Sequence, residues 1–215
     1  MVPDRSGELA DDLLTIGAVS FSPESPYTWA SGMLSPVYCD NRLTLGYPAV
    51  RRRITDGFAE SVVGTDVDVV AGTATAGIPH AAWLADRLGL PMVYVRSAAK
   101  GHGKSRRVEG PLAEGSRVVL VEDLISTGMS SLAAVQGLRD EGASVVLLVA
   151  IFSYGLPVAR EAMGRDGVDV RVLTSFDRLL DAAARSGQLS AGGLDSLRAW
   201  YRDPAAWSVA RGGAG

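Results

Sequence analysis

One stretch of the sequence decides the fold: Val118-Val119-Leu120-Val121-Glu122-Asp123-Leu124-Ile125-Ser126-Thr127-Gly128-Met129-Ser130. Its apolar first part predicts a buried strand that presents two adjacent carboxylates at its carboxyl end. A short loop of hydroxyl residues and glycine follows, and apolar residues at helical spacing then predict a helix over Ser130 to Glu141. A strand that leads through a short turn into a helix is part of a βαβ unit, so we expect a parallel sheet.

The same alternation of short β-branched runs and helical periodicity extends from about residue 60 towards the carboxyl end. It predicts an α/β fold: an open, doubly wound, mainly parallel sheet flanked by helices, with ligands at the carboxyl ends of the strands. The predicted strands are Val67–Ala71, Met92–Arg96, Arg117–Val121, Val145–Phe152 and Val170–Leu173, and a further helix is predicted over Pro79–Leu88.

The two ends of the chain differ from this pattern. Near the amino end, an amphipathic segment from Leu9 to Ile16 precedes a stretch punctuated by proline, serine and glycine, Phe21 to Tyr47, which predicts a small hood over the sheet. Near the carboxyl end we expect two short helices between Leu179 and Trp207 and a frayed tail from Arg211 to Gly215. The predicted organisation is a single domain, 1–215, with an N-terminal helix and hood over about 1–60, a core over about 61–178 with a mobile loop at 96–110, and C-terminal helices and tail over about 179–215.

Composition excludes several classes of protein. With 215 residues, 47% of them hydrophobic and 21% charged, the chain can bury a sizeable core. Its formal net charge of −3 gives no general attraction to nucleic acids or acidic membranes, so neither is expected as a partner. The longest apolar run, Val145 to Phe152, is too short to span a bilayer, and the opening residues lack the pattern of a signal peptide. We expect a cytoplasmic protein whose single cysteine, Cys39, is a small core residue.

The deciding stretch also predicts a binding site. The first N–H groups of a helix have no partner within the helix, so with the helix dipole they form a site for a phosphate group. Ser126, Thr127 and Ser130 can add hydroxyl donors, while Glu122 and Asp123 can accept hydrogen bonds from the vicinal hydroxyls of a ribose. A sugar phosphate therefore satisfies both halves of the motif. Serines that merely cap a helix are a common alternative, but this alternative does not explain the two acids.

A basic segment follows the predicted strand Met92 to Arg96. Both lysines of the chain, Lys100 and Lys104, lie in it, together with His102, one of only two histidines. Its glycines keep the backbone pliable, and a pliable basic loop that closes over a polyanion suits a departing pyrophosphate, whose charge grows as its bond to carbon breaks. A solvated charged hairpin is the alternative interpretation of the segment on its own.

A third segment, Ala71 to His80, combines a strand, a turn of small residues and a helix with proline near its first turn. Small residues let backbone N–H groups approach an anion closely, so the segment is a candidate cradle for pyrophosphate. His80 is expected inside the helix, in a structural position.

These segments together resemble the orotate phosphoribosyltransferases, a family with the type I phosphoribosyltransferase fold. The motif around Glu122 is typical of phosphoribosyltransferases in general, and the hood combined with the Lys100 loop points to orotate. The resemblance runs in order from about residue 10 to residue 160 and more loosely to Trp207. It is carried by Tyr27 to Gly32, Ser35 to Arg42, Gly72 to Pro79, Lys100 to Lys104 and Glu122 to Ser130.

The resemblance implies an enzyme of pyrimidine biosynthesis that uses 5-phospho-α-D-ribose 1-diphosphate (PRPP), orotate and Mg²⁺. The ion would be bound mainly through the substrate, so no direct protein ligand is expected. A homodimer is implied, in which each basic loop closes over the neighbour's site. Lys100, His102 and Asp123 are the implied catalytic residues. PRPP would contact Arg96, Lys100, His102, Glu122, Asp123, Leu124, Ile125, Ser126, Thr127, Gly128, Met129 and Ser130, and orotate would contact Ser126, Ser31, Gly32, Tyr38 and Asp40.

The chain departs from the family pattern at a few positions. Many members have lysine where Ala30, Ala76 and Ser97 stand, and Phe152 to Gly155 occupies the region where some members supply an arginine to the base. We interpret these changes as those of a bacterial branch. Two other functions stay open: a phosphoribosyltransferase for a purine or uracil, and a non-enzymatic PRPP-binding regulator of transcription, which would need a nucleic-acid-binding module.

Overall fold

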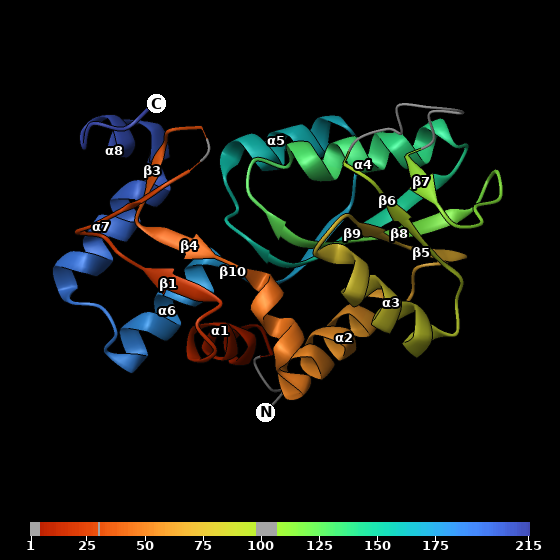
Figure 1. The fold of residues 1–215 in the computed structure, drawn as a ribbon, viewed down its shortest axis with the longest axis horizontal. Coiled ribbons are helices and arrows are strands. Elements are labelled where there is room, and N and C mark those ends of the chain that lie inside the picture. Colours follow the sequence, from red (N-terminus) through yellow and green to blue (C-terminus); the bar gives the residue numbers. More distant parts are fainter. Residues whose placement is uncertain (1–4, 30, 98–106) are drawn as a thin grey trace.

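The computed structural model describes residues 5–29, 31–97 and 107–215. A six-stranded sheet forms its centre, in the order β10-β9-β8-β5-β6-β7 (Figure 1). All neighbouring strands are parallel except β6 and β7, which pair antiparallel at one edge. The strands are β5 (Val69–Thr73), β6 (Met92–Val95), β7 (Val108–Glu109), β8 (Arg117–Ile125), β9 (Ser144–Ser153) and β10 (Val170–Ser175). This confirms the predicted doubly wound, mainly parallel sheet.

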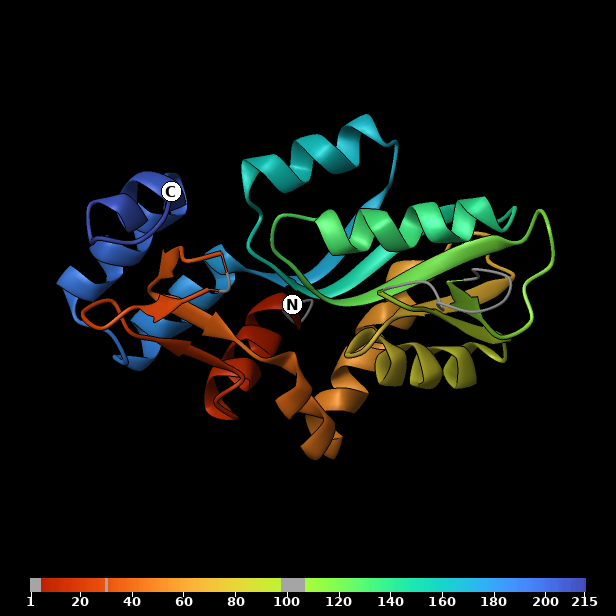
Figure 2. The same cartoon turned by 45° about the horizontal axis from the view of Figure 1, so that its top comes forward.

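Helices cover both faces of the sheet, as Figure 2 shows. One face carries α4 (Met129–Asp140) and α5 (Pro157–Arg165), and the other carries α1 (Arg5–Thr15), α2 (Pro48–Val62) and α3 (Gly77–Leu88). The helix after β5 and the helix after β8 therefore lie on opposite faces. In the described ranges, no helix combines the length and apolar composition needed to cross a membrane.

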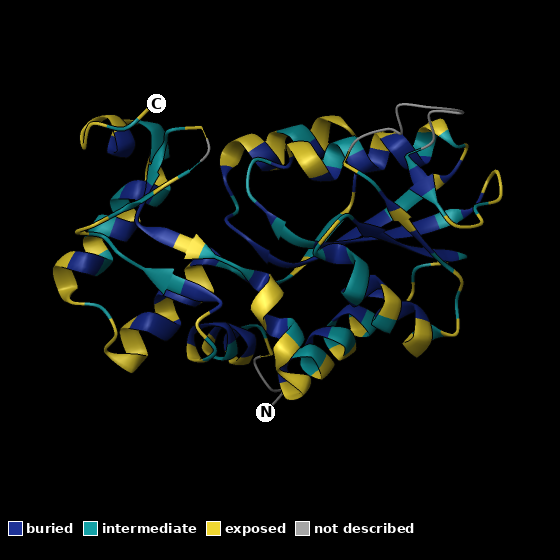
Figure 3. Cartoon of the chain, viewed as in Figure 1, coloured by how far each residue is buried: buried dark blue, intermediate teal, exposed yellow. Residues whose placement is uncertain are grey.

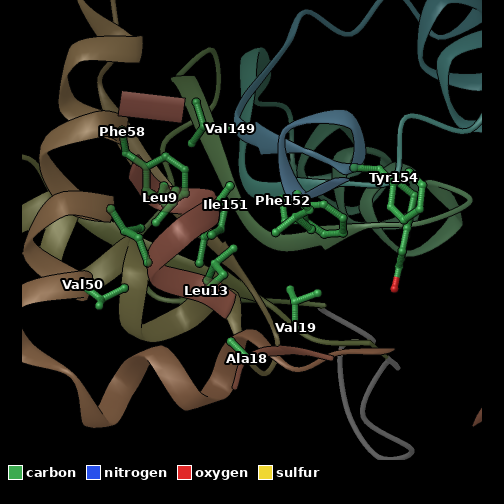
Figure 4. Close-up of a cluster of buried hydrophobic side chains, with 14 of the residues drawn as sticks. Leu9, Leu13, Ala18, Val19, Val50, Phe58, Val149, Ile151, Phe152 and Tyr154 are labelled. Atoms are coloured by element: carbon green, nitrogen blue, oxygen red, sulfur yellow. The ribbon is translucent and has the colours of Figure 1, made fainter. Parts of the chain in front are cut away.

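The strands are buried on both faces because side chains alternate between two hydrophobic cores. In β8, Val119 and Val121 pack towards α1, α2 and α3, whereas Val118 and Leu120 pack towards α4 and α5. The cartoon coloured by burial shows the same contrast between buried strands and exposed outer helix faces (Figure 3). Figure 4 shows part of the first core, in which side chains of α1, α2 and β9 meet, and its labelled members are Leu9, Leu13, Ala18, Val19, Val50, Phe58, Val149, Ile151, Phe152 and Tyr154.

The predicted hood consists of two small antiparallel ladders. One pairs β1 (Val19–Phe21) with β4 (Val37–Cys39), the other pairs β2 (Tyr27–Thr28) with β3 (Leu34–Ser35), and a 3₁₀ helix, η1 (Asn41–Gly46), leads into α2. Three carboxyl-terminal helices, α6 (Phe176–Ser186), α7 (Ala191–Arg202) and α8 (Pro204–Val209), gather beside this hood (Figure 1).

An aromatic cluster joins the hood to these helices. The ring of Trp200 on α7 lies 6.1 Å from that of Trp29 in the hood, 5.6 Å from Tyr154 and 5.4 Å from Phe176, measured between centroids. Trp200 and Phe176 are fully buried. Aromatic rings at such separations add to the burial energy of their area, so the cluster fastens the hood to the carboxyl-terminal part.

The structure corrects several predicted boundaries. The strand predicted to end at Val121 extends to Ile125, because its parallel pairing with β9 continues as far as Ser153. Glu122 and Asp123 therefore lie inside β8 and not after it. Helices α2 and α5 were not predicted, and the region from Leu179 to Trp207 contains parts of three helices instead of two.

The predicted frayed tail is also wrong. The N–H of Ala214 donates to the carbonyl oxygen of Gly32 at 3.0 Å, and the N–H of Gly213 donates to that of Ser208 at 3.0 Å. A parallel β-bridge between Met33 and Ala214 accompanies these bonds. The segment is held because the hood offers it unpaired backbone groups, which composition alone does not reveal.

The aromatic cluster generates a stability prediction. Trp200→Ala removes a fully buried ring from the contact between hood and α7, and should lower the free energy of unfolding by about 3–5 kcal/mol through lost burial and a residual cavity. Val209→Ala, on the neighbouring α8, removes a side chain that is 59% exposed and should change it by less than about 0.5 kcal/mol. Urea unfolding followed by circular dichroism measures both. A loss below about 1 kcal/mol for Trp200→Ala would contradict the assigned role of the cluster.

Candidate active site

A cavity of about 340 Å³ opens at the carboxyl ends of β5, β6 and β8. Neighbouring strands β5 and β8 send their helices to opposite faces of the sheet, and ligands of doubly wound folds bind in the crevice that such a switch creates. The cavity brings together parts of all three segments singled out in the sequence. Its lining residues are Thr73, Ala74, Val95, Arg96, Ser97, Arg107, Glu122, Asp123, Leu124, Ser126, Ser130, Ala133 and Ala134.

The loop after β8 has the geometry of an anion cradle. Residues 126–128 form a bend and α4 begins at Met129, so the N–H groups of its first turn are directed at the loop. Gly128 precedes the helix with φ +81°, in the left-handed region that favours glycine. Ser126, Ser130 and Leu124 line the cavity. The side chain of Ile125 is buried in the core, that of Met129 is 76% exposed and that of Thr127 is half-buried.

Glu122 is a buried carboxylate with its hydrogen bonds supplied by the protein. Its Oε1 accepts a hydrogen bond from Thr73 Oγ1 at 2.6 Å, and its Oε2 accepts one from Ser131 Oγ at 2.9 Å. Burial raises the pKa of the Glu122 carboxyl, and the nearby charge of Asp123 acts in the same direction. Glu122 thereby ties the end of β5 to the start of α4 across the floor of the cavity.

Asp123 stands on the same strand, next to the hood. Asn41 Nδ2 donates to the Asp123 carbonyl oxygen at 2.6 Å, which joins η1 to β8. Burial raises the pKa of the Asp123 carboxyl, and the charge of Asp40 in the hood adds to this effect. The two adjacent acids thus differ in their surroundings: Glu122 faces hydroxyl donors, whereas Asp123 faces the side on which the hood stands.

The turn after β5 approaches β8 very closely. A Cβ atom at Gly77 would lie 2.5 Å from both Thr73 Oγ1 and the Val121 carbonyl oxygen, so only glycine fits there. The peptide bond between Ala74 and Thr75 is cis. Thr73 and Ala74 line the cavity, which places the predicted pyrophosphate cradle beside the acidic pair.

The basic segment contributes two arginines to the cavity, Arg96 and Arg107. The N–H of Arg96 donates to the Arg107 carbonyl oxygen at 2.9 Å, and the Arg107 guanidinium donates to the Arg96 carbonyl oxygen at 3.3 Å. The predicted loop 96–110 therefore extends too far, because Val108 and Glu109 pair with β6 as β7. Lys100 and His102, the predicted catalytic residues of this loop, lie outside the described residues.

The hood holds the four other residues predicted to contact the base. Tyr38 is 44% exposed on β4, with its ring 5.5 Å from that of Tyr27. The Arg42 guanidinium donates to both carboxylate oxygens of Asp40, at 2.6 and 2.8 Å, and lowers the pKa of that carboxyl. Ser31 and Gly32 lie in the turn between β2 and β3. The described lining of the cavity includes none of these four, so the structure does not bring them to the acidic pair directly.

His80 and Cys39 are embedded in the structure. His80 lies within α3, as predicted, with its Nε2 3.3 Å from Thr44 Oγ1. Burial lowers the pKa of His80 to about 4, so the ring is neutral near pH 7. Cys39 is half-buried on β4, and burial raises the pKa of its thiol above the usual range. Neither group is placed to act as a base or a nucleophile.

Several residues in or beside the site were given no role from the sequence, among them Arg107, Thr73 and Asn41. Arg107 is the last residue of the basic segment. Its place in that segment could have indicated that it binds an anion together with its neighbours. Thr73 was part of the predicted cradle, but its bond to Glu122 joins residues 49 positions apart. Asn41 contacts Asp123 across 82 positions, which no local pattern indicates.

Comparisons with known proteins agree with this geometry. A family model described as the phosphoribosyl transferase domain matches residues 48–173. The orotate phosphoribosyltransferase of Listeria monocytogenes is 50% identical over 202 residues, which cover 93% of this chain and 97% of that relative. Its counterpart from Aeropyrum pernix, a solved structure, superposes with a TM-score of 0.73 at 33% identity, over 85% of this chain and 99% of that one.

A second solved structure carries a ligand. It is the orotate phosphoribosyltransferase of Mycobacterium tuberculosis H37Rv in complex with 5-phospho-alpha-D-ribosyl 1-diphosphate, with a TM-score of 0.64 at 27% identity, over 82% of this chain and 99% of that one. The family model spans more than half of the chain, and the relatives match nearly all of it. The chain therefore belongs to the phosphoribosyl transferase domain family and, within it, to the orotate phosphoribosyltransferases.

Proposed function

We propose that the chain transfers the ribose 5-phosphate group of PRPP to orotate, giving orotidine 5′-monophosphate and diphosphate in de novo pyrimidine biosynthesis. The bond between the anomeric carbon and the diphosphate oxygen breaks, a bond from that carbon to the ring nitrogen of orotate forms, and the nitrogen loses its proton. The observation that carries the proposal is the single cavity in which the acidic pair, the anion cradle and two arginines meet. Its volume of about 340 Å³ suits a small-molecule substrate.

The 5-phosphate of PRPP is assigned to the loop from Ser126 to Ser130. Unpaired N–H groups at the start of α4 and the helix dipole favour an anion there, and the serine hydroxyls add donors. Met129 is the first residue of the helix, so its backbone N–H is one of these unpaired donors.

The ribose is assigned to Asp123, whereas Glu122 supports the site through hydrogen bonds within the protein. Both oxygens of Glu122 already accept hydrogen bonds from Thr73 and Ser131, whereas Asp123 borders the cavity beside the hood. The Asp123 carboxylate can accept hydrogen bonds from the ribose hydroxyls. It also stabilises the positive charge that develops on the ring as diphosphate departs.

The expected cofactor is Mg²⁺. The ion prefers oxygen ligands and in sites of this kind is held largely by substrate phosphates, so it would be bound mainly through PRPP, beside the Asp123 carboxylate that lines the cavity. When bound, it offsets negative charge on the diphosphate. Asp123 orients the ribose hydroxyls.

The diphosphate is assigned to the turn after β5 and to the two arginines of the basic segment. Thr73, Ala74, Arg96 and Arg107 all line the cavity. Lys100 and His102 would complete this end by neutralising the leaving group. His102, with a reference pKa of about 6.5, could also protonate it. Closure of the loop would protect the cation-like transition state from water.

Orotate is assigned to the hood side of the site, near Ser126, Ser31, Gly32, Tyr38 and Asp40. The bond from Asn41 to the Asp123 carbonyl oxygen and the charge of Asp40 acting on Asp123 support this assignment, because they set the hood beside the ribose end. A homodimer with basic loops that serve the neighbouring site and a cytoplasmic location complete the proposal, both on the strength of the family resemblance.

The choice of base is tested directly. The purified chain with PRPP and Mg²⁺ should release diphosphate with orotate, and with uracil, adenine, guanine and hypoxanthine at rates at least about 100-fold lower, because a site built for the orotate carboxylate leaves polar groups unpaired with other bases. Loss of orotate absorbance and release of diphosphate are the measurements. Preference for another base would indicate a phosphoribosyltransferase for that base. Binding of PRPP without turnover of any base would favour the alternative of a non-enzymatic regulator of transcription.

The acidic pair gives a second prediction. Asp123→Asn should lower kcat by about 100-fold or more, since the charge of Asp123 acts on the cation-like ribose in the transition state. Its melting temperature should stay close to that of the wild type, because the group serves the ligand. Asp181→Asn, on the exposed side of α6 and outside the cavity lining, is the matched control and should retain full activity. Full activity of Asp123→Asn would remove Asp123 from the mechanism.

The shared active site gives a third prediction. Lys100→Ala and Asp123→Asn proteins, each inactive alone, are mixed under conditions that let subunits exchange. If the loop serves the neighbour's site, each mixed dimer gains one site with both groups intact. Random exchange makes half of the dimers mixed, so about a quarter of wild-type activity should return by the symmetry of the pair. Mass spectrometry of differently tagged subunits verifies exchange, and exchange without recovered activity would show that each loop serves its own subunit.

A further inference from the structure

The segment from Trp207 to Ala214, here called the strap, folds back from α8 onto the hood. The strap is connected to the hood through Ser208, which is fully buried. Ser208 Oγ accepts a hydrogen bond from the Leu34 N–H at 2.8 Å and donates one to the Ala214 carbonyl oxygen. The Ala214 N–H in turn donates to the Gly32 carbonyl oxygen at 3.0 Å. One hydroxyl therefore fixes both the hood strand β3 and the returning strap, and Figure 1 shows α8 and β3 side by side.

The strap holds a particular part of the hood, residues 31–34, here called the hood turn. The turn closes on itself through two bonds, from the Gly32 N–H to the Trp29 carbonyl oxygen and from the Trp29 N–H to that of Met33, both at 2.8 Å. Trp29 is fastened on another side by Trp200 and Tyr154. The position of the turn relative to the sheet thus depends on two carboxyl-terminal contacts, the aromatic cluster at its start and the strap along residues 32–34.

The hood turn carries Ser31 and Gly32, which the proposed function assigns to orotate. No residue of the strap is among the described lining residues of the cavity, yet the strap bonds directly to the backbone of Gly32. We propose that the strap is a positioning element for the base: it sets where the hood turn presents Ser31 and Gly32, and so determines affinity for orotate without taking part in PRPP binding. This inference rests on the proposed function.

The packing of Gly213 offers a sharp way to disturb the strap. A Cβ atom there would lie 2.5 Å from Ser208 Oγ and 2.6 Å from Leu34 Cγ, closer than real side-chain carbons come. Gly213→Ala therefore pushes the strap away from the hood turn. Ser208→Ala breaks the same connection by the opposite means, because it removes the shared hydroxyl and adds no volume. Gly192→Ala on α7 is the matched control, since nothing lies within 4 Å of the atom it adds.

The three variants and the wild type are compared by steady-state kinetics with each substrate varied in turn, and by calorimetric titration with PRPP. For Gly213→Ala and Ser208→Ala we expect the KM for orotate to rise roughly threefold to tenfold, as loss of one or two hydrogen bonds implies. The KM for PRPP and the calorimetric Kd should stay within about twofold of the wild type. Gly192→Ala should match the wild type throughout.

The outcomes separate the inference from the proposed function. An unchanged KM for orotate, or an equal rise in the KM for both substrates, overturns the positioning role, since a merely structural strap would not favour one substrate. If Gly213→Ala fails to fold, Ser208→Ala decides. If the wild type proves to use another base, the proposed function fails and the strap is judged on the KM for that base. A wild type that turns over no base overturns both.

Discussion

The active-site edge of the sheet depends on one buried carboxylate, Glu122. A charged group that leaves water must find hydrogen-bond donors, and here each oxygen has a hydroxyl: Thr73 at the end of β5 and Ser131 in the first turn of α4. Because these donors belong to two different elements, β5 and α4, Glu122 holds the ends of these elements together. Oε1 of Glu122 also accepts a hydrogen bond from the Asp123 N–H at 3.1 Å, so loss of the Ser131 hydroxyl is the more costly change: it removes the donor to Oε2, and an unsatisfied buried polar group costs about 1–3 kcal/mol. The spacing between the end of β5 and the start of α4 is thus fixed by contacts within the protein itself.

The sequence predicted the central strands correctly because their pattern depends on residues that are close together in the chain. Each central strand shows as a run of apolar, β-branched residues because both faces of a parallel sheet are buried. The meeting of Glu122, Ser126 and Ser130 at one cavity could be predicted because they are close neighbours in the chain and one strand, one turn and one helix start place them all. Helix α2 was missed although its signal was present: Val50, Ile54 and Phe58 recur every fourth residue and are buried.

Prediction failed where two distant segments supply one feature. Asn41 meets Asp123 across 82 positions, and the hood acquires its support from a tail that composition alone marks as frayed. Such contacts form only after folding has brought distant segments together, and the hydrophobic periodicity of the sequence does not indicate which segments will meet. The proposed base end combines the hood, η1 and β8 in this way. The proposed phosphate end therefore rests on one local motif, whereas the proposed base end rests on the resemblance to a family.

The bond between Leu34 and Ser208 joins residues 174 positions apart, and this separation constrains the order of folding. A chain leaves the ribosome amino end first, and domains form as their partners emerge. The hood strands are therefore made well before Trp200 and Ser208, which hold them. The closing of so long a loop is entropically costly until the sheet has already brought its ends together. The central sheet can thus assemble during synthesis, while the hood, made early, is completed only when the strap is released from the ribosome.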